Sequence, residues 1–380
     1  MNKLFRVALG LLGLGSTQFA QAAWDMNMRV GATDISRGIF DLHMAVLWVC
    51  VAIGVLVFGA MIWSMVFHRK SKGYIAAKFH EHLGVEIAWT IVPAIILVVM
   101  GYYGGVMLIK IEDSSNSDMT VKVTGHQWKW EYEYPEEGIR FFSNLAQTSR
   151  DAAGLNVGIN PATVDNYLLE VDNPLVLPIG KKVRFLLTSN DVNHAWWAPD
   201  LAIKKDAIPG FINDMWATIN EPGIYRGQCA ELCGKDHGFM PVVVIAKTQE
   251  DYDAWVVEQT ASAAAAKEAE SKEWTKADLM AQGETVYNTS CAACHQAAGT
   301  GIPGVFPALV GSPLTIGDTV DQHIDVVMNG KAGTAMQAFG TQLSDADLAA
   351  VITYERNSWG NNAEGDAKHV IQPTTIKAKR

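Results

Sequence analysis

Residues 229–240 read CAELCGKDHGFM and place two thiols, a carboxylate, an imidazole and a thioether in one short loop. Another histidine, His194, lies upstream in the stretch NDVNHAWWAPD. Thiolate, imidazole and thioether groups together are the ligands that copper prefers in proteins. The alternative is a disulfide turn, in which His237 and Met240 would have no role. The residues therefore favour a copper site over a disulfide.

The second cysteine of this loop suggests how many metal ions it binds. A mononuclear copper site of the electron-transfer type uses one thiolate, two histidines and a weak axial methionine, so a second thiolate would be surplus. Two thiolates can instead bridge two copper ions, each bound by one histidine. Met240 would then complete one copper and the Glu231 backbone carbonyl the other. We interpret the loop as an electron relay, because a rigid pair spreads the geometric change on reduction over more bonds.

The copper loop lies in a region of short β-rich runs that covers residues 119–249. Examples are MTVKVTGHQWKWEYEYP and KKVRFLLTS, and the runs are separated by Pro, Gly and Asn. The apolar alternation of Val121 and Val123 fits strands that bury one face. We expect a β-sandwich here, with residues 141–166 as a long loop or insertion.

A second motif, CAACH, follows the pattern C-x-x-C-H. Cys291 and Cys294 can add to the vinyl groups of a haem, and His295 can take one axial position on the iron. A thioredoxin-like redox pair would require a βαβ context, and the surrounding sequence does not show one. The motif therefore predicts a covalently attached haem c.

The rest of the C-terminal sequence predicts a small helical domain over residues 278–360. Met336, in NGKAGTAMQAFG, is our candidate for the second axial ligand, because thioether ligation opposite histidine raises the haem potential. The competing Met328 lies in a helical pattern and fits a core position better. Residues 250–277 form an Ala/Glu/Lys-rich helical or semi-rigid linker, and residues 361–380 are expected to be a mobile tail.

Two long apolar segments precede the β-rich region. Residues 39–67 and 87–109 are each long enough to cross a bilayer, so residues 39–110 are expected to form a transmembrane hairpin. The loop between them is rich in Lys and Arg, which predicts that it is cytoplasmic. Residues 1–22 have the charged, apolar and small-residue regions of a signal peptide; an uncleaved membrane helix is the alternative. Both signals place the later domains on the outer side of the membrane.

Composition limits the possible partners. Of the 380 residues, 49% are hydrophobic, which fits a chain partly embedded in membrane lipid. The formal net charge of −10 argues against nucleic acid as a partner, because phosphate binding requires a basic surface.

The chain resembles subunit II of haem-copper cytochrome c oxidases, in the branch with a fused C-terminal class I cytochrome c. The similarity rests on the apolar hairpin followed in order by VEIAWTIVPAIIL, GHQWKWEYEYP, KKDAIPG and CAELCGKDHGFM. It implies a multidomain protein with a two-helix transmembrane hairpin, a β-sandwich cupredoxin domain and a C-terminal all-α cytochrome c domain. It also implies a dinuclear copper centre (CuA) with the ligands His194, Cys229, Glu231, Cys233, His237 and Met240.

The resemblance implies further roles, residue by residue. Trp128 corresponds to a tryptophan near the copper centre at the surface where electrons enter. Glu231 and Asp206 correspond to residues around a magnesium ion at the boundary with subunit I. Glu86, at the cytoplasmic start of the second apolar segment, corresponds to the mouth of a proton pathway; an interfacial carboxylate without a transport role is the alternative.

The expected function is that of a cytochrome c oxidase subunit in the bacterial inner membrane. Electrons would pass from a cytochrome donor through haem c and the dinuclear copper to the oxygen-reducing centre of subunit I, coupled to proton translocation. The partners would be subunit I, other oxidase subunits, the cytochrome donor and membrane lipid. Two alternatives are the electron-entry subunit of a nitric oxide reductase and a copper-loading or storage protein, which would not need a haem.

Overall fold

The structure is a computed structural model whose chain forms two compact units, residues 1–108 and 109–380. The predicted signal peptide lies outside the described residues. These are residues 27–75, 77–153, 158–269, 272–340, 342–362 and 365–380.

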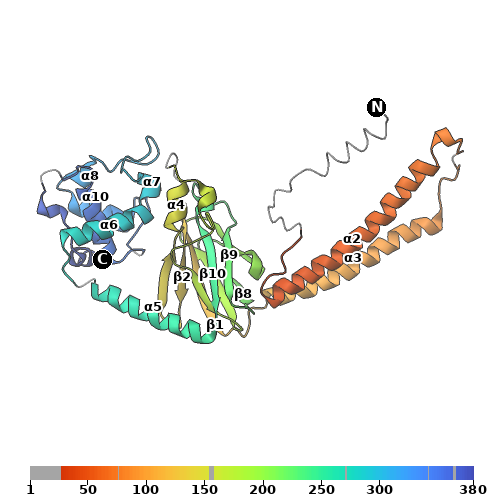
Figure 1. The fold of residues 1–380 in the computed structure, drawn as a ribbon, viewed down its shortest axis with the longest axis horizontal. Helices are drawn as coiled ribbons and strands as arrows, with labels where there is room; N and C mark the ends of the chain where they lie inside the picture. Colours follow the sequence, from red (N-terminus) through yellow and green to blue (C-terminus); the bar gives the residue numbers. More distant parts are fainter. Residues whose placement is uncertain (1–26, 76, 154–157, 270–271, 341, 363–364) are drawn as a thin grey trace, which may run out of the picture. The chain divides into compact units, whose positions relative to one another are not determined.

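The first unit consists mainly of two long apolar helices, α2 (Asp34–Phe67) and α3 (Leu83–Glu112), with the short 3-10 turn η1 (Lys70–Lys72) between them. Thr33 caps α2: its hydroxyl accepts from the Ser36 N–H at 2.9 Å, and its own N–H donates to the Ser36 hydroxyl at 3.0 Å. Both helices are long and apolar enough to cross a membrane, and they lie side by side (Figure 1). The predicted two-helix hairpin is therefore confirmed, with its first helix starting earlier than expected.

The β domain (residues 119–247) is a sandwich of two five-stranded sheets. Their strand orders are β3-β2-β1-β5-β8 and β4-β10-β9-β6-β7. The pairs β1/β5 and β4/β10 are parallel, and the other paired strands are antiparallel. The strands are β1 (Met119–His126), β2 (Lys129–Tyr134), β3 (Ile139–Ser143), β4 (Leu175–Pro178), β5 (Lys182–Ser189), β6 (His194–Ala198), β7 (Ile203–Ala207), β8 (Asn213–Thr218), β9 (Gly223–Cys229) and β10 (Pro241–Lys247).

Aromatic side chains hold the two sheets of the β domain together. Phe185 of β5 stacks on Trp196 of β6 with ring centroids 5.4 Å apart. The Trp196 indole N–H donates to the Tyr132 hydroxyl at 3.1 Å, so the buried polar atoms of both rings are satisfied. The Tyr134 hydroxyl likewise donates to the Val176 carbonyl at 2.8 Å. The predicted β-sandwich is confirmed. Its short helices are α4 (Gln147–Ala153), η2 (Pro161–Thr163), η3 (Pro199–Leu201) and η4 (His237–Phe239).

The predicted linker begins as a helix, α5 (Gln249–Ala269), whose first turns pack on the β domain (Figure 1). Trp255 of α5 lies 5.3 Å from the ring of Tyr134. The Tyr252 hydroxyl donates to the Glu137 carboxylate at 2.9 Å. The start of the linker is therefore anchored, because its sequence places two aromatic residues on the face that meets the sandwich.

The helical domain (residues 276–377) confirms the predicted all-α C-terminal region. Its first helix crosses α10 at Gly283, where an added Cβ would lie 2.2 Å from the Ala350 carbonyl oxygen, so only glycine allows this approach. Beside this crossing, Tyr287 packs on Tyr354 with ring centroids 5.5 Å apart. The helices are α6 (Lys276–Ser290), α7 (Ala292–His295), α8 (Pro313–Ile316), α9 (Val320–Asn329), α10 (Asp345–Asn357), η5 (Ala367–His369) and α11 (Pro373–Lys377).

The C-terminal segment differs from the expected mobile tail. Ile371 and Ile376 are buried in the same apolar core as the helices of this domain. The Ile371 N–H donates to the Thr353 hydroxyl of α10 at 2.8 Å. The overall polarity of the segment conceals these two apolar side chains, which pack into the core of the helical domain.

Replacing Ile376 with alanine should destabilise the helical domain by about 2–5 kcal/mol, the usual cost of truncating a buried isoleucine. Ile316→Ala is the matched control, because Ile316 is 47% exposed whereas Ile376 is fully buried. Chemical unfolding of this domain, followed by tryptophan fluorescence, measures the difference. Equal unfolding midpoints for the two variants would show that the tail does not pack.

Candidate copper and haem sites

Strand pairing positions the copper loop. The loop joins β9 to β10, and the Cys229 N–H donates to the Met240 carbonyl at 3.3 Å, which closes the loop at its base. His194 begins β6, the neighbour of β9. The Ala230 N–H donates to the Ala195 carbonyl at 2.9 Å and holds the loop against β6. The sheet therefore brings His194 beside the two cysteines.

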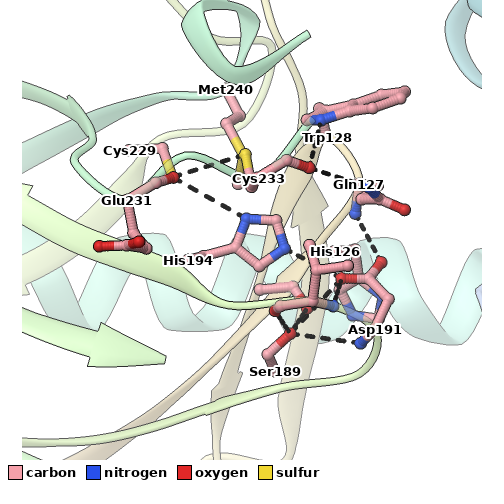
Figure 2. Close-up of polar contacts among 12 residues, drawn as sticks. His126, Gln127, Trp128, Ser189, Asp191, His194, Cys229, Glu231, Cys233 and Met240 are labelled. Atoms are coloured by element: carbon pink, nitrogen blue, oxygen red, sulfur yellow. Dashed lines mark hydrogen bonds and ion pairs between the residues drawn. The ribbon is translucent and has the colours of Figure 1, made fainter. Parts of the chain in front are cut away.

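The soft side chains of the predicted copper site gather around two free thiols. The sulfur atoms of Cys229 and Cys233 are 3.8 Å apart, too far for a disulfide bond of about 2.05 Å. The His194 Nδ1 atom lies 3.9 Å from the Cys229 sulfur (Figure 2), and the His237 Nδ1 atom lies 3.5 Å from the Cys233 sulfur. The Met240 sulfur is 3.6 Å from the Cys233 sulfur. Each thiol therefore has its own imidazole.

The Glu231 backbone carbonyl also faces this cluster. Its oxygen lies 3.3 Å from the Cys229 sulfur, while the Glu231 side chain is exposed. Among the described residues, His194, Cys229 and Cys233 have their ligand atoms within 4.8 Å of one another, and all three are buried. This donor set fits copper, because it combines two thiols, two imidazoles, a thioether and a carbonyl.

Asp191, whose role is not predicted from the sequence, orients His194. Its Oδ1 atom lies 2.9 Å from the His194 Nε2 atom, so the other ring nitrogen faces the sulfur atoms (Figure 2). Burial would raise the pKa of Asp191, but hydrogen bonds from His194, Val192 and Gln127 hold it below its usual value. Asp191 precedes the histidine by three residues, which is a recognisable signal, since ligating histidines usually donate their second N–H to such a group.

The contact between the two sulfurs shifts the pKa values of the two thiols in opposite directions. It lowers the pKa of Cys229, with further help from His194, and raises the pKa of Cys233. Burial opposes the first shift and reinforces the second. Copper binding requires both sulfurs as thiolates and would therefore release protons.

Trp128 and its neighbour attach to the copper loop. The Trp128 indole N–H and the Gln127 amide both donate to the Cys233 carbonyl, at 3.2 and 2.9 Å (Figure 2). Both side chains also line a cavity of about 400 Å³ that contains the predicted haem-binding residues. Trp128 therefore lies between the two predicted redox sites.

This cavity fits a haem. Cys291, Cys294, His295 and Met336 all line it. The His295 Nδ1 atom lies 2.9 Å from the Pro307 carbonyl oxygen, which leaves Nε2 available for iron. By contrast, Met328 packs in the apolar core and does not contribute to the lining among the described residues. Met336 as the second axial ligand stays a prediction.

Three predicted carboxylates, those of Asp206, Glu231 and Glu86, are not part of the metal-binding group found among the described residues. Asp206 is an exposed residue of β7. Glu86 lies in the first turn of α3, where its carboxylate accepts from the His82 N–H at 3.0 Å. The magnesium and proton-entry assignments therefore stay predictions.

Comparison with known families covers most of the chain. Residues 21–104 match the family described as cytochrome c oxidase subunit II, transmembrane domain, and residues 119–247 match its periplasmic domain. Residues 278–354 match the family described as cytochrome c oxidase, cbb3-type, subunit III.

Individual relatives agree with these matches. A probable cytochrome c oxidase subunit 2 from Rickettsia bellii is 34% identical over 258 residues, which is 67% of this chain and 93% of the relative. A cytochrome c oxidase subunit 2 from Cereibacter sphaeroides is 34% identical over 59% of this chain and 77% of its own length. The crystal structure of the periplasmic domain of cytochrome oxidase subunit II from Bradyrhizobium japonicum is 36% identical, with a TM-score of 0.35, over 39% of this chain and 98% of that chain. The chain belongs to the cytochrome c oxidase subunit II family and carries a cytochrome c domain at its C-terminal end.

Proposed function

We propose that this chain carries electrons from a cytochrome donor through a covalent haem c and a dinuclear copper centre to the oxygen-reducing site of subunit I. The observation that carries this proposal is the pair of free sulfurs 3.8 Å apart, each with its own imidazole. A cavity in the same compact unit is lined by the three residues of the C-x-x-C-H motif, and this supports the proposal. Electron delivery to subunit I would be coupled there to proton translocation.

The protein's own residues prepare both sites for one-electron chemistry, which the bound copper pair and the haem iron would supply. Cys229, Cys233, His194, His237, Met240 and the Glu231 carbonyl would hold the copper, and Cys291, Cys294, His295 and Met336 the haem. Asp191 fixes the His194 ring, and burial keeps bulk water from the sulfurs. Such rigidity limits the rearrangement that accompanies electron transfer.

Trp128 is the proposed electron-transfer residue between the sites. Its indole N–H bonds to the carbonyl of Cys233, and its side chain lines the haem cavity. We assign it to transfer from the haem within the chain, whereas the family resemblance alone implied entry from a separate donor.

The remaining assignments concern the membrane and subunit I. Glu86 would admit protons from the cytoplasmic side, and Asp206 and Glu231 would hold a magnesium ion shared with subunit I. The chain would span the bacterial inner membrane twice, with the β and helical domains in the periplasm. The relatives named above are oxidase subunits, which favours an oxidase over a nitric oxide reductase.

Electron paramagnetic resonance of the purified full chain tests the copper assignment. We expect a seven-line hyperfine pattern, because one unpaired electron would be shared by two equivalent copper nuclei. Cys233→Ser should abolish this pattern, whereas Cys50→Ser, in α2, should retain it. A four-line pattern from a single copper in the unsubstituted chain would contradict the proposal.

Asp191→Asn should weaken copper binding by about 10–100-fold, the usual effect of removing the partner of a ligating histidine. The amide can present N–H to the His194 ring and no longer enforces one orientation. Competition with a copper chelator measures the affinity. The control is Glu133→Gln, on β2, which loses the partner of Lys122 and should leave the copper affinity unchanged. A similar loss of affinity in both variants would contradict a specific role for Asp191.

Met336→Ala should eliminate the charge-transfer absorption of the methionine–iron bond and lower the haem potential, since thioether ligation raises it. Met328→Leu is the matched control, because it keeps an apolar side chain in the core. Optical redox titration of the full chain provides both readouts. If the absorption band disappears in the Met328 variant instead, the ligand assignment is wrong.

A further inference from the structure

Lys129 of β2 is a buried cation without an anionic partner. Its side chain lies against two aromatic rings, with Nζ 4.6 Å from the Phe142 centroid and 5.6 Å from the Phe339 centroid. The residue is only 6% exposed, and its Nζ atom makes no hydrogen bond or ion pair with any described residue. Burial lowers the pKa of Lys129 to about 8, and Cys291 and nearby carboxylates oppose this shift.

Arg150 of α4 is a second cation from the same domain. It lies in the predicted insertion, residues 141–166, to which neither the copper ligands nor the haem ligands belong. Its Nε atom is buried without a hydrogen-bond partner, and its side chain forms no ion pair within the described part of the chain. Burial lowers the pKa of Arg150, but a guanidinium remains charged at neutral pH.

Both cations line the cavity that contains the haem-binding residues. They come from the β domain, whereas Cys291, Cys294 and His295 belong to the helical domain. Two hydrogen bonds hold the domains together here: the Gln337 amide donates to the Gln127 carbonyl at 2.7 Å, and Lys235 Nζ donates to the Ala293 carbonyl at 2.8 Å. The haem cavity is therefore completed by a wall from the neighbouring domain.

The acidic groups of the cavity do not cancel this charge directly. Glu355 is occupied by His323, whose Nε2 atom lies 2.8 Å from the carboxylate. Asp236 is partly buried and forms no ion pair with Arg150 or Lys129 among the described residues, although its charge stabilises the Arg150 cation from a longer distance. Glu131, Asp172 and Asp191 act on Lys129 in the same way, also without an ion pair to it among the described residues. Burying a charge without a partner is costly, so two such cations in one cavity suggest that they act on a group that occupies it.

We propose that the positive charges of Lys129 and Arg150, which come from the β domain, raise the reduction potential of the haem in the helical domain. The inference rests on the proposed function, because it requires haem in the cavity. Reduction adds one electron, supplied by the cytochrome donor, and neither makes nor breaks a bond. A nearby cation in a medium of low dielectric stabilises that added negative charge. The same cations would also neutralise the carboxylate groups of a haem, and this would likewise raise its reduction potential.

Optical redox titration of the full chain, assembled in its oxidase, tests this role. At the potential where the haem of the unsubstituted protein is half reduced, Lys129→Met and Arg150→Gln should each lower the reduced-to-oxidised ratio by roughly tenfold, with a larger effect in the double variant. Lys129→Arg retains the charge and should restore most of the ratio. Lys122→Met makes the same charge change on the solvent side of β1 and is the matched control.

The outcomes separate this inference from the proposed function. An unchanged haem potential in the double variant, or an equal shift in Lys122→Met, would overturn the inference. A lowered potential in Lys129→Met that Lys129→Arg does not restore would overturn it too, because it would indicate packing rather than charge. Covalent haem content and the copper resonance of the unsubstituted chain report on the proposed function independently of these potentials.

Discussion

The hydrogen bond from the Cys229 N–H to the Met240 carbonyl closes the loop that carries most of the soft ligands. It exists because β9 and β10 are antiparallel neighbours, so the ends of the loop are fixed by the sheet. The same sheet places β6, and with it His194, beside β9. A copper site built this way takes its geometry from strand pairing, which does not depend on the metal.

The proposed copper and haem sites share a short stretch of the β domain. Gln127 and Trp128 precede β2 and bond to the Cys233 carbonyl, and the following residue, Lys129, faces the haem cavity. One short stretch of the β domain therefore contacts both sites. Arg150, from the predicted insertion, lines the same cavity, which its sequence context did not indicate.

The parts that sequence predicted well are those in which residue type and spacing determine the structure. The two apolar helices, the alternating strands and the C-x-x-C-H motif are of this kind, and so is the cluster around Cys229 and Cys233. Two of the missed features depend on contacts between distant segments: Lys129 meets a ring of another domain, and Ile376 packs into the core of the helical domain. Asp191 lies only three residues from His194, but its role depends on the orientation of the His194 ring, which the sequence does not specify.

The anchored helix α5 has a consequence for how the haem domain meets its neighbour. Tyr252 and Trp255 fix the first turns of α5 to the sandwich, so the helix that leads from the β domain toward the helical domain starts from a fixed position. Their encounter is intramolecular, so its effective concentration is set by the covalent connection and is insensitive to dilution. In the proposed function, the delivery of electrons by an external cytochrome would remain a collision between separate molecules, and we expect that step alone to respond to ionic strength through diffusional steering.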